Sequence, residues 1–228
     1  MEPNAAGPPP GYSVSPPPGG APPSGPPARA EWSGLGVSLG GRVLLRDFTA
    51  SAFDGQVVGV VGPAGTDLDA VLLALAGRFG PVTGSVVIQG SPESVSLGGV
   101  PEEEHLDPLL TVHETLAEVS RPSADGSTRQ SADWSLMATG LTSRVDARIR
   151  DLNVEERFRL GIAMGAASGA SLIVTDLSRV AGHQASDELW TLLRQLAASG
   201  RVVVVAAPDR HEFMNLVIPV PASLEAAR

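Results

Sequence analysis

The chain of 228 residues contains neither cysteine nor lysine. Without cysteine it has no disulfide, no thiolate metal ligand and no thiol nucleophile. Without lysine it cannot form a Schiff base, and none of its own side chains supplies the ammonium group that many phosphate sites use. All 16 of its basic residues are therefore arginines.

Positive charge and long apolar runs are scarce as well. The 25 acidic residues outnumber the basic ones and give a net charge of −9. This balance excludes nucleic acid as an expected partner, because proteins that bind it present a basic surface. A membrane-spanning helix needs about 20 consecutive apolar residues, and the closest stretch, 160–174, is interrupted by glycine and serine. The sequence therefore predicts a protein that does not span a membrane.

Residues 1–30 differ in composition from the rest of the chain. They hold 11 of the 20 prolines, five glycines and only two charged residues, Glu2 and Arg29. Because proline fixes φ and has no N–H to donate, this segment is predicted to be an extended or disordered tail. A tail of this composition is either a solvated leader or a proline-rich ligand for an aromatic groove.

Alternating strands and helices are predicted for the remainder, with apolar runs between glycines as strands. The predicted strands are Val57–Val61, Ser85–Ile88, Leu172–Thr175 and Val202–Val205. The predicted helices are Asp69–Ala76, Thr111–Val119, Ala132–Thr139, Glu155–Ala167 and Asp187–Ala198. Strands that are apolar throughout indicate a parallel sheet covered by helices on both faces.

The segment from Gly59 to Gly77 combines a strand, a glycine-rich turn and a helix, which is the setting of a phosphate-binding loop. Further landmarks follow in a fixed order along the chain. They are Gly84–Gly90, Val100–Glu102, Pro108–Leu116, Leu152–Arg157, Asp176 placed 24 residues after Leu152, and Ala206–Ala207 after an apolar strand. In order and spacing, from about Trp32 to Asp209, the chain resembles the nucleotide-binding subunits of ABC transporters.

The resemblance implies an α/β fold of the P-loop NTPase type, that is, an ABC ATPase core with a parallel sheet flanked by helices and a small helical subdomain. We expect the tail at residues 1–30 and the ABC ATPase-like domain at residues 31–228, with the helical subdomain at approximately 105–165. In the family, the part that corresponds to Thr111–Leu116 docks on the membrane domain.

The resemblance places a nucleotide-binding loop at residues 62–70, but the residue types that hold phosphate are replaced. The loop consists of Gly62, Pro63, Ala64, Gly65, Thr66, Asp67, Leu68, Asp69 and Ala70. Leu68 stands where the family has its lysine, and Asp69 where a serine or threonine holds Mg²⁺. We expect Asp67 and Asp69 to cap the free N–H groups of the helix and to repel a triphosphate.

The other positions that carry chemistry in the family are replaced too. Glu102 stands at the loop glutamine, Asn153-Val154-Glu155 at the Ser-Gly-Gly of the signature, and Leu177 at the catalytic glutamate. His183, Ala207 and Leu39 stand at the D-loop aspartate, the switch histidine and the adenine-stacking aromatic. Only Asp176, the Walker B aspartate, remains, and it fits a loop cap as well as a metal ligand.

A group of arginines surrounds the signature position. It consists of Arg144, Arg148, Arg150, Arg157 and Arg159. In the family this zone lies beside the contacts with other subunits. The simpler interpretation is that these side chains form ion pairs with Asp146, Asp151, Glu155 and Glu156, which lie nearby in the sequence.

Together these features lead to the hypothesis of a degenerate ABC-type subunit with no catalytic residues and no metal site. It would be a non-hydrolysing structural or regulatory subunit of a membrane protein complex. The expected partner is a membrane-embedded transporter-like subunit or another ABC-type subunit. The expected location is the cytoplasm, free or at the inner face of the cell membrane. The alternative is an ABC ATPase that still binds and slowly hydrolyses ATP. It would use the backbone amides of residues 62–66, Asp176 for Mg²⁺ and an arginine of a partner, and Glu102 and Asp176 are then vestigial positions of the same site. Only this alternative involves the cofactors ATP and Mg²⁺.

Overall fold

The computed structural model describes residues 26–80, 82–90, 95–98, 106–120, 128–180 and 186–221. Its strands are β1 (Ala30–Leu39), β2 (Arg42–Ala52), β3 (Val57–Val61), β4 (Val82–Ile88), β5 (Val95–Leu97), β6 (Leu172–Asp176), β7 (Val202–Ala207) and β8 (Leu216–Pro219). Its α-helices are α1 (Thr66–Leu75), α2 (Val112–Val119), α3 (Thr128–Ala138), α4 (Val154–Ala167) and α5 (Asp187–Ala198). Two short 3₁₀ turns, Thr142–Arg144 and Ile149–Asp151, precede α4.

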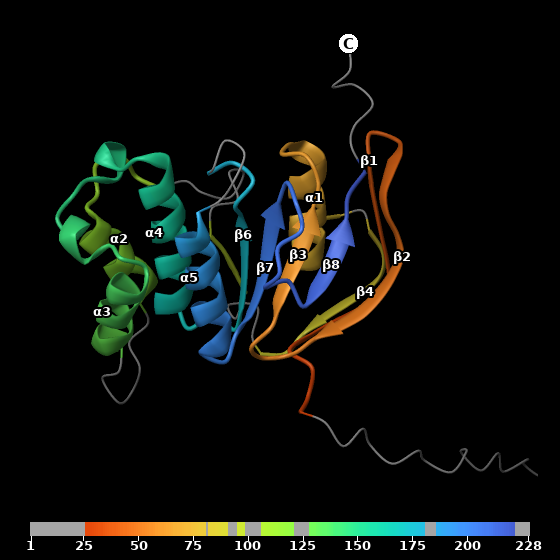
Figure 1. Ribbon diagram of the computed structural model, residues 1–228, viewed down its shortest axis with the longest axis horizontal. Helices are drawn as coiled ribbons and strands as arrows, with labels where there is room; N and C mark the ends of the chain where they lie inside the picture. The colour runs from red at the N-terminus through yellow and green to blue at the C-terminus, as the bar shows by residue number, and fades with distance from the viewer. Residues whose placement is uncertain are drawn as a thin grey trace, which may run out of the picture.

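The main sheet is parallel and has the order β5-β6-β7-β3-β8. Successive side chains of a strand point to opposite faces, and they divide the core accordingly. Val58 and Val60 pack with α1 on one face, whereas Val57 packs with α4 and α5 on the other. Figure 1 shows α1 on one side of this sheet and α4 and α5 on the other. The predicted parallel sheet with helices on both faces is thus confirmed.

A second, antiparallel sheet with the order β2-β1-β4 was not anticipated by the sequence. It packs on the side of α1 that faces away from the main sheet, so α1 lies between two sheets (Figure 1). Trp32 of β1 is fully buried there, and its indole Nε1 donates to the Leu75 carbonyl at 3.0 Å. This arrangement explains why nearly every residue of α1 is buried.

Helices α2, α3 and α4 form a third core, whose buried residues run from Val112 to Ala167. A helical subdomain is expected at approximately 105–165, so this core extends slightly beyond the expected end. Val112, Leu116, Leu136 and Leu160 are among its buried residues. Thr111 caps α2 in a capping box with Glu114, as a Thr-x-x-Glu pattern predicts. Among the described residues, no helix has the length and apolar character that a membrane span requires.

Several boundaries differ from those predicted. The helix α1 begins at Thr66, three residues before Asp69, because Gly65 already provides its N-cap. At the start of the chain, Ala28 and Ala30 are already buried, and the Arg29 guanidinium forms an ion pair with Asp54 at 2.6 Å. The folded part therefore begins slightly before residue 31. The prediction for residues 1–25 lies outside the described residues.

Candidate functional site

Residues 62–65 connect β3 to α1 at the carboxyl edge of the main sheet. Gly65 has φ +151°, a conformation that side chains disfavour. A Cβ on Gly62 would come within 2.9 Å of the Val220 carbonyl, so only glycine fits there. These two glycines give the segment the form of a phosphate-binding loop that leads into a helix.

Leu68 occupies the lysine position of this loop and is fully buried. It belongs to the apolar core between the two sheets. Its Cδ1 lies 3.6 Å from the point where a Cβ of Gly62 would stand. The inner side of the loop is therefore filled by hydrocarbon, which offers a phosphate neither a hydrogen bond nor a charge.

The two aspartates of the first turn of α1 form ion pairs with arginines. Asp67 accepts a hydrogen bond from Arg42 of β2 at 2.7 Å, and Asp69 accepts one from Arg179 at 2.5 Å. Both aspartates are buried, and the side chain of Asp69 is 4% exposed. The sequence indicated that these carboxylates would cap α1; in the structure each of them binds a guanidinium group from another part of the chain.

Asp176, at the end of β6, is held by the same Arg179. Its Oδ2 accepts from Arg179 Nε at 2.8 Å, and its Oδ1 accepts from the backbone N–H of Ser178 at 2.8 Å. The carboxylate thus closes the turn after β6, which is the loop-cap role that the sequence left open. Arg179 in turn connects β6 to α1 by bridging Asp176 and Asp69.

The Arg179 guanidinium keeps its charge in this position. Burial alone lowers the pKa of Arg179, but the hydrogen bond to Asp176 and the charges of Asp69 and Asp176 raise it above its ordinary value. The cluster of Arg42, Arg179, Asp67, Asp69 and Asp176 has two positive and three negative groups. Its formal charge is therefore −1, although a phosphate site requires a positive one.

Two further positions expected near the reaction centre are apolar and buried. Leu177 stands at the place of the catalytic glutamate and packs into the core beside α5. Ala207 ends β7 at the place of the switch histidine and is also buried. Neither side chain can accept a proton, so neither position supplies a general base.

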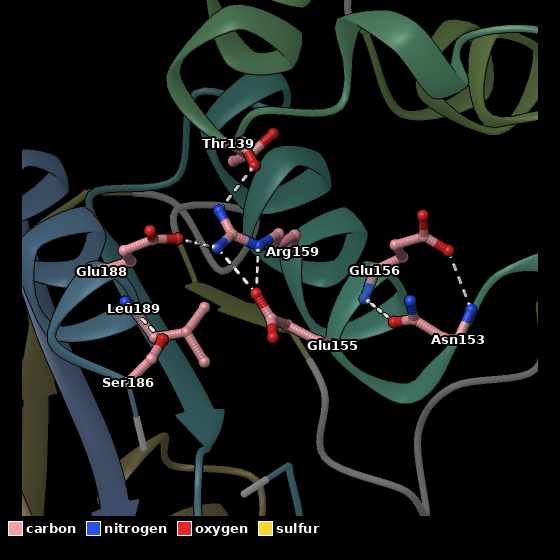
Figure 2. A network of polar contacts seen from close by, with 8 residues as sticks. All are labelled: Thr139, Asn153, Glu155, Glu156, Arg159, Ser186, Glu188 and Leu189. Carbon is pink, nitrogen blue, oxygen red and sulfur yellow. Dashed lines mark hydrogen bonds and ion pairs between the residues drawn. The ribbon is translucent and has the colours of Figure 1, made fainter.

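The helix α4 starts at the signature position and caps its own N-terminus. Asn153 Oδ1 accepts from the Glu156 N–H at 2.8 Å, and the Glu156 carboxylate accepts from the Asn153 N–H at 2.9 Å. Figure 2 shows this reciprocal pair. Val154 follows the cap and is 61% exposed. The first turn of α4 thus presents an apolar side chain where two glycines are expected.

Glu155, which stands at the second glycine of the signature, pairs with Arg159 at 2.7 Å. Arg159 also donates to the Thr139 carbonyl at 3.1 Å and lies 3.6 Å from Glu188 of α5. In Figure 2 the Arg159 side chain lies among groups from α4, α5 and the end of α3. It therefore joins three helices, a structural role that the sequence did not indicate.

Three of the five arginines around the signature position form ion pairs of the predicted kind. Arg144 pairs with Glu156 at 3.0 Å and Arg150 with Asp151 at 3.7 Å, in addition to Arg159 with Glu155. The charges of these three arginines are thus paired within the chain.

Among the polar residues predicted at the site, Asp67 and Asp69 of α1 and Asp176 of β6 are brought together. Glu102 and His183 lie outside the residues that the structure describes. Leu39 is half-buried against the core. Within the described part of the chain, no group of three His, Asp or Glu side chains is placed to hold a metal ion. Arg42 and Arg179 are the site residues that sequence reasoning missed, because they lie 25 and 110 positions from their partners in α1.

Comparison with known proteins gives relatives by sequence, although no family model matches the chain. The arabinose import ATP-binding protein AraG of Escherichia coli O157:H7 is 27% identical over 199 residues, which cover 80% of this chain and 39% of that protein. The ABC transporter ATP-binding/permease protein Rv1747 of Mycobacterium tuberculosis is 31% identical over 180 residues, covering 73% of this chain and 21% of that protein. The chain thus spans about two fifths or less of the length of these relatives.

Solved structures support the same assignment at the level of the fold. CbiO1 of Clostridium perfringens, part of the ABC transporter complex cbiONQ, aligns with a TM-score of 0.64 and 17% identity over 80% of this chain and 79% of that one. A putative ABC transporter ATP-binding protein of Pyrococcus furiosus aligns with a TM-score of 0.66 and 16% identity over 84% and 96%. By homology and by fold, the chain belongs to the ATP-binding cassette family, as a homologue of the ATP-binding proteins of ABC transporters.

Proposed function

We propose that this ABC-type chain is a structural or regulatory subunit that does not hydrolyse ATP. The observation that carries the proposal is the Arg179 guanidinium, which holds Asp69 of α1 and Asp176 of β6 together. In the resemblance these two positions serve Mg²⁺. Here a side chain of the protein supplies the positive charge between them, so the ends of α1 and β6 are joined without a ligand.

The electrostatics of the cluster support the same proposal. A nucleoside triphosphate carries several negative charges, and the formal charges of the five charged residues around the loop sum to −1. Placing like charges together costs several kcal/mol. Arg42 and Arg179 would have to leave the carboxylates of Asp67 and Asp69, both buried, in order to bind phosphate. The neutral Leu68 offers nothing that offsets this cost.

Thermal unfolding of the full chain with 10 mM Mg·ATP tests the proposal, with Mg²⁺ alone as the control. We expect no change in Tm. A ligand present at 100 times its Kd stabilises a protein by about 2.7 kcal/mol, which for a domain of this size raises Tm by roughly 5–10 °C. A rise of that size with Mg·ATP and not with Mg²⁺ would overturn the proposal and favour an ATPase that uses the backbone amides of residues 62–66.

We further propose that the partner is a membrane-embedded transporter-like subunit. This part is supported by the relatives, which include an arabinose import ATP-binding protein and a part of an ABC transporter complex. A pocket of about 280 Å³ between α2, α4 and β5 supports this part. Leu97, Leu110, Thr115, Val119 and Met164 are among its lining residues. In the resemblance the corresponding region receives a helix of the membrane domain.

A charged substitution in this pocket should release the chain from membranes. We expect the wild-type chain to sediment with the membrane fraction of the cells that produce it, and Met164→Arg to shift most of it to the supernatant. Val87→Arg is the matched control, because Val87 is 51% exposed on β4, away from the pocket. Equal sedimentation of both variants, or a wild-type chain found only in the supernatant, would contradict the proposed partner.

A further inference from the structure

An apolar groove lies between α3, α4 and α5, on the other side of α4 from the pocket described above. Its volume is about 240 Å³. Ala166, Leu192 and Leu196 form its floor and are buried in the protein core. Trp134 and Met137 of α3 line it as well and are 37% and 68% exposed. The groove therefore presents an aromatic and an aliphatic wall to the solvent.

The Trp134 ring is held in place by a contact with Arg201. The Arg201 guanidinium lies 5.6 Å from the centroid of its ring, a cation–π contact. Arg201 is itself fixed, because its Nε donates to the Ala170 carbonyl at 3.1 Å and its Nη2 to the Ala166 carbonyl at 3.4 Å. The ring is thus ordered before any ligand arrives, which lowers the entropic cost of binding.

Grooves with an exposed, fixed aromatic ring are the sites that recognise proline-rich segments, since such segments are already extended in solution. The chain carries a segment of this kind in residues 1–25, with proline runs at positions 8–10 and 16–18. We propose that the groove between α3 and α5 binds the run Pro8-Pro9-Pro10 of this chain.

The number of residues between each run and the folded part favours the run at 8–10 over the run at 16–18. Sixteen steps separate Pro10 from Pro26, and at about 3.1 Å per residue in the extended polyproline form they span about 50 Å. A folded body of about 200 residues is roughly 40 Å across. The run Pro16-Pro17-Pro18 is only eight steps from Pro26 and reaches about 25 Å. The first run therefore reaches further over the surface of its own chain than the second run does.

Acrylamide quenching of tryptophan fluorescence tests this proposal in the full chain. Trp32 and Trp190 are 0% and 4% exposed, so quenching reports mainly on Trp134. We expect replacement of Pro8, Pro9 and Pro10 by serine to raise the quenching constant about twofold. The matched replacement of Pro16, Pro17 and Pro18 by serine should leave it unchanged. A synthetic peptide of residues 5–13 should restore protection in the first variant.

The groove side is tested with Met137→Ser, which retains the Trp134 reporter and changes a side chain that is 68% exposed. It should weaken binding of the peptide at least fivefold. Equal quenching in both proline variants and the wild type would overturn the proposal, as would an effect of the 16–18 variant alone. A dimer that survives in the 8–10 variant and still shields Trp134 would also overturn it, because the occupant would then be the folded surface of a second copy.

Discussion

Replacing Arg179 with alanine should destabilise the protein by about 2–4 kcal/mol. The substitution leaves the carboxylates of Asp69 and Asp176 in place, at 3% and 1% exposure, without the guanidinium that now pairs with both. Removing one partner of a buried ion pair costs about 3–5 kcal/mol. We reduce that figure because the Arg179 side chain is itself 37% exposed and water screens part of the interaction. Urea unfolding of the variant and the wild type measures the difference.

Two further variants identify the cause of this loss. Arg46→Ala removes an exposed arginine of β2 and should change stability by less than about 0.5 kcal/mol. Adding Asp69→Asn to Arg179→Ala removes one of the two carboxylates that lost their partner, so about 1 kcal/mol or more should return. If Arg179→Ala unfolds at the same urea concentration as Arg46→Ala, the bridge contributes nothing and the central observation for the proposed function is lost.

The elements that the sequence predicts well are those whose signal is local. The run Val57–Val61 and the helix Asp187–Ala198 have the predicted bounds, because apolar strands between glycines and an amphipathic period are properties of short segments. The N-caps Thr111 and Asn153 also follow from local patterns, since each is followed three residues later by Glu. The turn glycines Gly62 and Gly65 could be recognised for the same reason.

The elements that the sequence does not reveal depend on contacts between distant segments. The strands β1 and β2 contain glycine and charged residues, and β1 has register shifts against both of its neighbours, so their periodicity is irregular. The strand β8 has only four residues and is held by its pairing with β3. Short or irregular strands of this kind are specified by the sheet they join rather than by their own composition.

At the candidate site, the replaced residues can be read from the sequence, but the contacts that take over their role cannot. The positions of Leu68, Asp69 and Asp176 follow from motif spacing. Motif spacing does not show that Asp69 and Asp176 share one arginine. Arg179 follows β6 in the sequence and contacts Asp69 only because the fold places α1 beside β6.

Replacing Trp32 with alanine should have the largest effect on stability, a loss of about 3–5 kcal/mol. Trp32 is fully buried between β1 and α1 and packs against Phe48 at 6.0 Å between ring centroids. Its removal leaves a large cavity in the core where the antiparallel sheet packs against α1. It also leaves the buried Leu75 carbonyl without the indole donor. For a chain of this size, the loss corresponds to a Tm lower by roughly 6–20 °C.

Conservative and matched variants separate the contributions of packing and hydrogen bonding. Trp32→Phe keeps most of the ring but removes the Nε1 donor, so it should cost about 1–3 kcal/mol, the penalty for a buried carbonyl left unsatisfied. Trp134→Ala makes the same change as Trp32→Ala at a site that is 37% exposed and should cost less than about 1 kcal/mol. If Trp32→Ala were no worse than Trp134→Ala, the antiparallel sheet would not depend on α1 for its core. If, on the other hand, the loss of Trp32 detached the antiparallel sheet from α1, Arg42 of β2 would also move away from Asp67 of the candidate site.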